Sequence, residues 1–134
     1  MSGAGTPRIR IVAAVIRDAA GRVLLVRKRG SRIFQQPGGK RDAGDPDDLG
    51  TLARELREEL GCELVEGSAR FLCRACAPAA NECGHLVEAE VYEVAVRGVV
   101  RAQAEIAKLC WVDPAAPGAL PVAALSREHI LPLL

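Results

Sequence analysis

The sequence has few aromatic residues, few histidines and almost no excess of charge. Phe, Trp and Tyr make up 3% of its 134 residues, so no obvious aromatic pair is present to stack on both sides of a planar ligand. Eighteen basic and seventeen acidic side chains give a net charge of +1, which argues against a nucleic-acid-binding surface built on bulk charge. We therefore expect a small-molecule ligand and no nucleic-acid partner.

Long apolar runs are also missing. No stretch approaches the ~20 apolar residues of a membrane-spanning helix, and residues 1–6 are small and polar, unlike a secretory signal. We expect a cytoplasmic protein with no membrane partner, and a homodimer is left open. At this length the chain fits one domain, residues 1–134, with residues 1–7 flexible.

The five cysteines are an odd number, which favours reduced thiols over a disulfide framework. Cys73 and Cys76 have the CxxC spacing of some zinc sites. However, their segment is expected to be extended, and in a strand residues three apart point to opposite faces. Because no second CxxC or HxxxH completes four ligands, we expect no structural zinc site.

Apolar runs rich in Val and Ile predict a sheet. The runs at 9–16 and 22–26, separated by the turn residues 18–21, predict a hairpin of buried strands. Further strands are expected near 68–77, from 86 to 96, near 98–102 and at 109–112. The stretch 122–134 is predicted to form a short helix that ends near Pro132.

The strongest helix signal covers residues 46–60. Its apolar residues recur at the three- and four-residue spacing of a buried stripe: Leu49, Leu52, Ala53, Leu56 and Leu60. Asp45 is predicted as the N-cap, Pro46 as the first helical residue and Gly61 as the left-handed residue that ends the helix.

The face opposite this stripe is acidic. Glu55, Glu58 and Glu59 stand at positions i, i+3 and i+4, which places three carboxylates within one face of the helix. Like charges so close destabilise a helix unless they are solvated or neutralised by a cation. Upstream, Gly38 and Gly39 form a turn in which the backbone can approach a ligand without a Cβ in the way. Together these features predict a metal and phosphate site.

The acidic segment resembles a known motif. Gly39, five residues, Asp45, eight residues and then the octapeptide 54–61, Arg-Glu-Leu-Arg-Glu-Glu-Leu-Gly, resemble the Nudix box of the MutT-like, nucleoside diphosphate-linked pyrophosphohydrolases. The preceding Pro-Gly-Gly-Lys and the later Trp111 strand agree with that family. The resemblance implies an α/β/α sandwich around a mixed β-sheet, with the box helix and a C-terminal helix.

Three positions depart from the usual box. Asp45 stands where glutamate is usual, the following gap is eight residues instead of seven, and Cys62 replaces the closing large aliphatic residue. In the family the upstream acid braces the loop against the box arginine, here Arg54. Because Asp45 is one methylene shorter, we predict that it caps the helix instead. Arg54 is expected to pair with Glu58 or with Asp45 and to orient the acidic cluster.

The resemblance implies hydrolysis of a phosphoanhydride bond by metal-activated water. Attack on such a phosphorus requires neutralised charge and an activated water, which Mg²⁺ or Mn²⁺ provides. By resemblance the metal ligands are Glu55, Glu58, Glu59 and the carbonyl of Gly38. Glu105, six residues before Trp111, is expected as a further ligand or as the general base. The catalytic residues are thus predicted to be Glu58, Glu59 and Glu105.

Other residues complete the prediction. Arg27, Lys28 and Lys40 are candidates to hold a substrate phosphate, and Glu88 and Glu90 are alternatives to Glu105. The substrate class stays open between a nucleoside triphosphate, a nucleotide sugar and a dinucleotide. The alternative function is a Nudix fold retained as a ligand-sensing or protein-binding module, but such modules typically lose box acids, and all three are present here.

Overall fold

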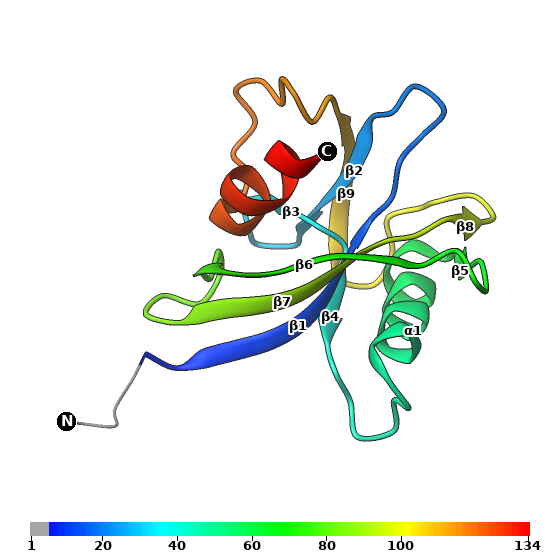
Figure 1. Ribbon diagram of the computed structural model, residues 1–134. Helices are drawn as coiled ribbons and strands as arrows, with labels where there is room; N and C mark the ends of the chain where they lie inside the picture. Colours follow the sequence, from blue (N-terminus) through cyan, green and yellow to red (C-terminus); the bar gives the residue numbers. More distant parts are fainter. Residues whose placement is uncertain (1–5) are drawn as a thin grey trace.

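The computed structural model describes residues 6–134 (Figure 1). The flexibility expected of residues 1–7 falls mostly outside this range. The elements are β1 Arg8–Val15, β2 Val23–Lys28, β3 Phe34–Gln35, β4 Gly38–Lys40, α1 Asp48–Leu60, β5 Glu63–Leu64, β6 Arg70–Pro78, β7 Leu86–Glu93, β8 Val96–Arg97 and β9 Ile106–Val112, followed by a π-helical turn, Leu125–Ile130, and a 3₁₀ turn, Leu131–Leu133. None of the helices in the described range is long and apolar enough to cross a membrane.

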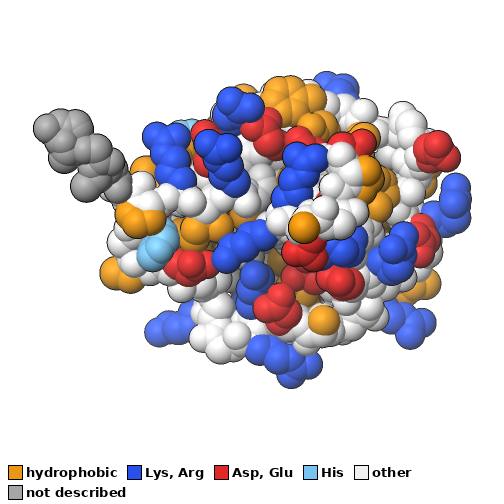
Figure 2. Space-filling view, turned by 90° about the horizontal axis from the view of Figure 1, so that it is seen from below, with side chains coloured by type: hydrophobic (Ala, Val, Ile, Leu, Met, Phe, Trp, Pro, Cys, Tyr) orange, Lys and Arg blue, Asp and Glu red, His pale blue; other side chains and the backbone are white. Residues whose placement is uncertain are grey.

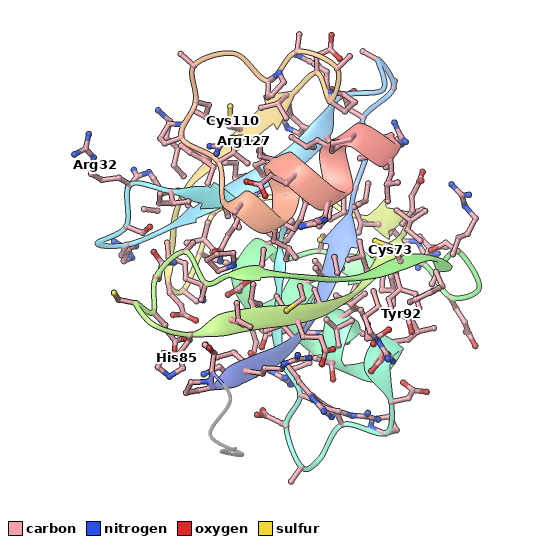
Figure 3. The ribbon with its side chains drawn as sticks, turned by 60° about the vertical axis from the view of Figure 1, so that its left-hand side comes forward. Arg32, Cys73, His85, Tyr92, Cys110 and Arg127 are labelled. Atoms are coloured by element: carbon pink, nitrogen blue, oxygen red, sulfur yellow. The ribbon has the colours of Figure 1, made fainter. Side chains whose placement is uncertain are left out.

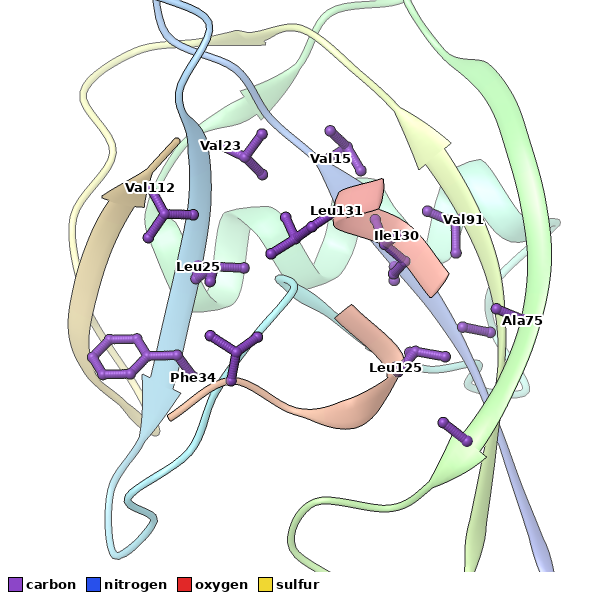
Figure 4. Close-up of a cluster of buried hydrophobic side chains, with 14 residues drawn as sticks. Val15, Val23, Leu25, Phe34, Ala75, Val91, Val112, Leu125, Ile130 and Leu131 are labelled. Carbon is purple, nitrogen blue, oxygen red and sulfur yellow. The ribbon is translucent and has the colours of Figure 1, made fainter. Parts of the chain in front are cut away.

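The central strands are buried on both faces, which sets the layers. On β1, Val15 packs in a hydrophobic cluster that the C-terminal turns cover with Leu125 and Ile130 (Figure 4). The neighbouring Ala14 points the other way, into a second cluster that α1 covers with Leu56. Since successive strand residues face opposite sides, one helical layer lies on each side of the strands. The predicted α/β/α sandwich is confirmed.

The strands divide into two main sheets and a short pair. The first, in the order β4-β1-β7-β6, is mixed, because β1 pairs parallel with β7 and antiparallel with β4. The second, β3-β2-β9, is antiparallel, and β5 pairs with β8. The predicted hairpin is therefore paired only near its turn, where the N–H of Asp18 donates to the carbonyl of Arg22 and the N–H of Leu24 donates to the carbonyl of Ile16. The two strands then separate, because β4 and β7 already occupy both edges of β1.

Helix α1 begins later than predicted. It starts at Asp48, and Asp47 is the N-cap, whose carboxylate accepts a hydrogen bond from the N–H of Gly50 at 2.8 Å. Asp45 and Pro46, predicted as the cap and the first helical residue, both precede the helix. The rest of the prediction agrees with the structure, with one exception: Leu49 is exposed at the first turn. Gly61 has the predicted left-handed conformation, with φ 65°.

The strand predicted near 98–102 is absent from the described structure. There the N–H of Arg101 donates to the carbonyl of Leu60 at 2.9 Å. The N–H of Gln103 donates to the carbonyl of Glu59 at 3.1 Å. The last carbonyls of a helix lack intrahelical donors, so this segment caps α1 instead of pairing with a strand. It also ties the loop before β9 to the acidic helix.

Candidate functional site

A cavity of about 380 Å³ opens where α1, β4 and the loop after β6 meet. It brings together residues from distant parts of the sequence: Gly38, Gly39, Glu55, Glu59 and Glu105, with Lys28 and Lys40. Apolar side chains of β1, β7 and the C-terminal turn line another part of the wall. On the face in Figure 2, acidic and basic side chains alternate, so the chemistry of this cavity is local and does not depend on a broad charged surface.

Glu59 is the most buried acid of the site. It is 3% exposed, and the charges of Glu55 and Glu105 lie near it. Burial first, and then the charge of Glu55, raise the pKa of Glu59 to about 7, although Lys28 acts in the opposite direction. Burial also raises the pKa of Glu55. Carboxylates crowded in this way favour a shared proton or a bound cation.

Arg54 holds the acidic helix to the loop before it. Its Nε and Nη2 donate to the two carboxylate oxygens of Asp45, each at 3.0 Å, and its Nη1 donates to Glu55 at 2.9 Å and to Glu58 at 3.1 Å. Nη2 also donates to the carbonyl of Lys40 at 3.0 Å. The Arg54 guanidinium therefore holds the pKa of Asp45 well below its usual range. The predicted capping role of Asp45 is wrong: it braces Arg54, and Asp47 caps the helix.

This correction gives a testable prediction for Asp45. We expect Asp45→Asn to lower the melting temperature and to reduce turnover about 10- to 100-fold, as is typical when a residue that orients a site is changed. The reason is that an amide removes the charge and turns an N–H₂ group toward Arg54. The matched control is Asp47→Asn, which should behave like the wild type, because asparagine caps helices as well as aspartate does. Wild-type melting curves and turnover for both variants would show that the contact between Asp45 and Arg54 is dispensable.

Two predicted site residues lie outside the cavity. Glu58 does not line it, and its side chain is 55% exposed beside Arg54. Arg27 also points elsewhere: its Nη1 donates to the carbonyl of Ser31 at 3.0 Å, and its guanidinium lies 5.9 Å from the ring centre of Phe34. Of the three cations proposed for substrate, only Lys28 and Lys40 line the cavity.

The alternatives to Glu105 are placed elsewhere as well. Glu88 forms ion pairs with Arg8 and Arg10 at 3.4 Å, and Glu90 pairs with Arg74. These pairs lie in a separate, charged depression of the sheet. His85 is half-buried beyond the loop, with Nδ1 3.2 Å from the carbonyl of Cys83 (Figure 3). Pro78, the last residue of β6, and the loop residues Ala79, Ala80, Asn81 and Glu82 line the cavity.

Two lining residues escaped the sequence analysis, Gln36 and Ser126. Both are buried and line the cavity. A signal for each was present: Gln36 stands two residues after the buried Phe34, on the same face of an extended segment. Ser126 follows an almost wholly apolar stretch. At both positions the pattern predicts a buried apolar residue. A polar side chain there is informative, because polar residues are mostly exposed.

The residues of the cavity fit a hard divalent cation in their chemistry. Carboxylate and carbonyl oxygens are the ligands that Mg²⁺ and Mn²⁺ prefer, and Glu55, Glu59 and Glu105 supply them around Gly38 and Gly39. These two glycines, predicted as a turn, begin strand β4, which pairs with β1; we keep the name glycine turn for them. Among residues 6–134, no three His, Cys, Asp or Glu side chains already converge as a closed metal site. Arg54 accounts for part of this, because it holds the carboxylates of Glu55 and Glu58. The fit therefore rests on the donor atoms and on the raised pKa of Glu59.

Solved structures share this architecture. The solution structure of the E. coli ORF135 protein is 27% identical, with a TM-score of 0.74, over 96% of this chain and 89% of that one. A MutT Nudix hydrolase from Burkholderia pseudomallei is 26% identical, with a TM-score of 0.77, over 95% of this chain and 98% of that one. The MutT protein of Methanosarcina mazei Go1 is 25% identical, with a TM-score of 0.73, over 96% and 94%. None of the curated proteins compared with the chain matches it.

A family model decides the assignment. The NUDIX domain model matches residues 7–134, so the match includes the glycine turn, the acidic helix and the C-terminal turns together. The family match in sequence and the matches in structure thus cover nearly the same part of the chain. The chain therefore belongs to the Nudix family and is a Nudix-type pyrophosphohydrolase.

Proposed function

We propose that the chain hydrolyses a phosphoanhydride bond in a nucleoside diphosphate that is linked to a further group, and that it uses Mg²⁺ or Mn²⁺. The observation that carries this proposal is the cavity itself. In it, Glu55 and Glu59 of α1 meet the glycine turn and Glu105, which come from two other segments of the chain. Buried carboxylates with raised pKa values are suited to bind a divalent cation. The substrate is a small nucleotide derivative.

Each residue has a defined part in the proposed reaction. Glu55, Glu59 and the carbonyl of Gly38 are the proposed metal ligands. Glu58, whose exposed side chain lies beside Arg54 outside the cavity, is proposed to turn from Arg54 to the metal. The metal would neutralise the phosphate oxygens and lower the pKa of a bound water. Lys28 and Lys40 are placed to contact phosphate as point charges. Glu105 is the proposed acceptor of the water's proton.

The proposal is tested by a substrate screen. Nucleoside triphosphates, nucleotide sugars and dinucleoside polyphosphates are incubated with the protein and Mg²⁺ or Mn²⁺, and released phosphate groups are measured. We expect turnover of at least one class, loss of turnover in EDTA and a higher melting temperature with Mn²⁺, since a cation that binds only the folded state stabilises it. Stabilisation by nucleotides without any turnover would favour the ligand-sensing alternative.

The role of Glu105 gives a separate prediction. Its backbone is fixed, because its carbonyl accepts a hydrogen bond from the N–H of Arg29 at 2.8 Å, but its side chain is exposed. Glu105→Gln should therefore leave the melting temperature in EDTA unchanged. It should lower turnover at least tenfold and flatten the acidic limb of the pH–rate profile, because general-base catalysis is worth a factor of about 10² to 10⁴. Wild-type turnover with that limb intact would make Glu105 an ordinary loop residue.

A further inference from the structure

Two buried polar atoms of the cavity have no hydrogen-bond partner in the described part of the chain. They are Oε1 of Gln36 and Oγ of Ser126. The two residues are 6% and 1% exposed, and both line the cavity. A buried polar atom that lacks a partner destabilises the fold. Two such atoms in one cavity are placed to bond to a ligand.

The two residues lie on neighbouring segments. Phe34 and Val122 pair in a parallel bridge. The N–H of Phe34 donates to the carbonyl of Pro121, and its carbonyl accepts from the N–H of Ala123, both at 2.8 Å. The chain then runs from Phe34 to Gln36 on one segment and into the C-terminal turn on the other. This pairing brings Gln36 and Ser126 to the same wall.

The hydrogen bonding of Gln36 fixes the chemistry that it presents. Its Nε2 donates to the carbonyl of Ala14 at 3.0 Å, and only the amide nitrogen can make that bond. The free atom is therefore the carbonyl oxygen, which accepts only, so the ligand must offer an N–H or O–H. The hydroxyl of Ser126 can donate or accept. The wall thus matches a ligand edge that offers a donor to Gln36 and either a donor or an acceptor to Ser126.

The other residues that line the cavity restrict the chemical class of the ligand further. Ile9, Ile11 and Leu125 are among its apolar residues, and none of the described residues that line the cavity is aromatic. A sugar inserted there would leave most of its hydroxyls without partners. A planar heterocycle has apolar faces and one polar edge, so it matches this wall. Without an aromatic stacking partner, its selection depends on the hydrogen bonds.

We propose that Gln36 and Ser126 read the edge of a nucleobase: an N–H of the base donates to Oε1 of Gln36, and Ser126 bonds to the adjacent ring atom. This inference rests on the proposed function, because it assumes that the substrate is a nucleotide. It makes the base, and not the leaving group, the part of the substrate that enters the apolar end of the cavity. The phosphates then lie toward Glu55 and Glu59.

The test uses uncharged nucleosides in EDTA, so neither metal binding nor hydrolysis affects the result. Two pairs are compared by NMR titration: cytidine with its analogue that lacks the 4-amino group, and adenosine with purine riboside. In at least one pair we expect the amino-bearing member to bind about tenfold or more tightly, because the analogue leaves Gln36 unpaired. Uridine, which offers a ring N–H, distinguishes an amino from an imino donor.

Variants separate recognition from folding. Ser126→Ala removes a hydroxyl that makes no bond in the free protein, so it should raise the melting temperature by about 2 to 5 °C and weaken nucleoside binding. The matched control is Ser68→Ala, whose hydroxyl donates to the carbonyl of Val65 at 2.7 Å; it should lower the melting temperature and leave binding unchanged. Gln36→Met should bind both members of each pair equally.

The outcomes are separable from those of the substrate screen. Equal binding within both pairs by the wild type, with uridine bound no more tightly than the analogues, would overturn the inference. So would a Gln36→Met variant that still prefers the amino-bearing nucleoside or uridine. A protein that discriminates the pairs but hydrolyses nothing would keep this inference and refute the proposed function. A protein that hydrolyses nucleotides without discriminating the pairs would refute this inference and keep the proposed function.

Discussion

Glu59→Gln is expected to reduce turnover at least about 100-fold and, at the same time, to stabilise the metal-free protein. The loss of turnover follows because a metal ligand acts on charge that develops in the transition state. The gain in stability follows because the wild-type fold buries a carboxylate beside Glu55 and Glu105. An amide has no charge, so this repulsion and the cost of burying the charge are removed. A residue that lowers stability while it supports activity is typical of a functional site.

The stabilising effect has a defined pH dependence. The pKa of Glu59 is about 7 in the folded protein, above its ordinary value of 4.5, so the folded protein holds this proton more tightly than the unfolded chain. The free energy of unfolding in EDTA should therefore fall as the pH rises from 4.5 to about 7, and then level off. The total fall is about 3 kcal/mol. Urea unfolding curves across this range measure it, and Glu59→Gln should abolish this part of the slope.

Two further variants make the result specific. Glu58→Gln should also lose turnover about 100-fold but gain no stability, since the Glu58 side chain is half-exposed. Glu63→Gln is the matched control: Glu63 lies just beyond the same helix, pairs with Arg57 at 3.2 Å and is outside the cavity, so both quantities should stay at wild-type values. Wild-type turnover in both Glu58→Gln and Glu59→Gln would refute the proposed mechanism.

The sequence predicted those parts of the fold that depend on local pattern. The apolar stripe of α1, its glycine end and the extended segments follow from periodicity, which one chain contains in full. What it missed depends on pairing between distant segments. The hairpin failed because β1 is already paired on both edges. The strand predicted near 98–102 failed because the N–H groups of Arg101 and of the following Gln103 bond to the end of α1.

The residues of the site can also be divided into those that the sequence indicated and those that only the structure identified. Residue spacing located the acidic face and the two glycines before any resemblance was considered, whereas Glu105 was suggested by the family position six residues before Trp111. Asp45 was misassigned because both Asp45 and Asp47 are good helix caps by type, and only the geometry shows which one reaches Gly50. Arg27 and Lys28 are equivalent in sequence, yet only Lys28 lines the cavity. Gln36 and Ser126 become significant only once their burial is known.

The second large effect concerns the glycine turn, where two adjacent substitutions should fail in different ways. At Gly38, φ is 144°, and a Cβ would lie 2.1 Å from the carbonyl oxygen of Val12. That oxygen belongs to the backbone of β1 and cannot move aside, so Gly38→Ala should lower the free energy of unfolding by about 3 kcal/mol or more. At Gly39, a Cβ would instead lie 2.4 Å from Cδ of Glu55. A side chain can turn away, so Gly39→Ala should cost about 1 kcal/mol or less but displace a proposed metal ligand.

We therefore expect Gly39→Ala to fold nearly normally, to lose turnover about tenfold or more and to require a higher Mn²⁺ concentration for the same rise in melting temperature. Gly38→Ala should lose stability first, whatever the metal concentration. The control is Gly44→Ala, because no atom lies within 4 Å of a Cβ at that position; it should be neutral or stabilising by up to about 1 kcal/mol. Urea unfolding, turnover and Mn²⁺ titration of the three variants provide the measurement. If Gly39→Ala had wild-type turnover and Mn²⁺ response, the contact between the glycine turn and Glu55 would have no part in the site.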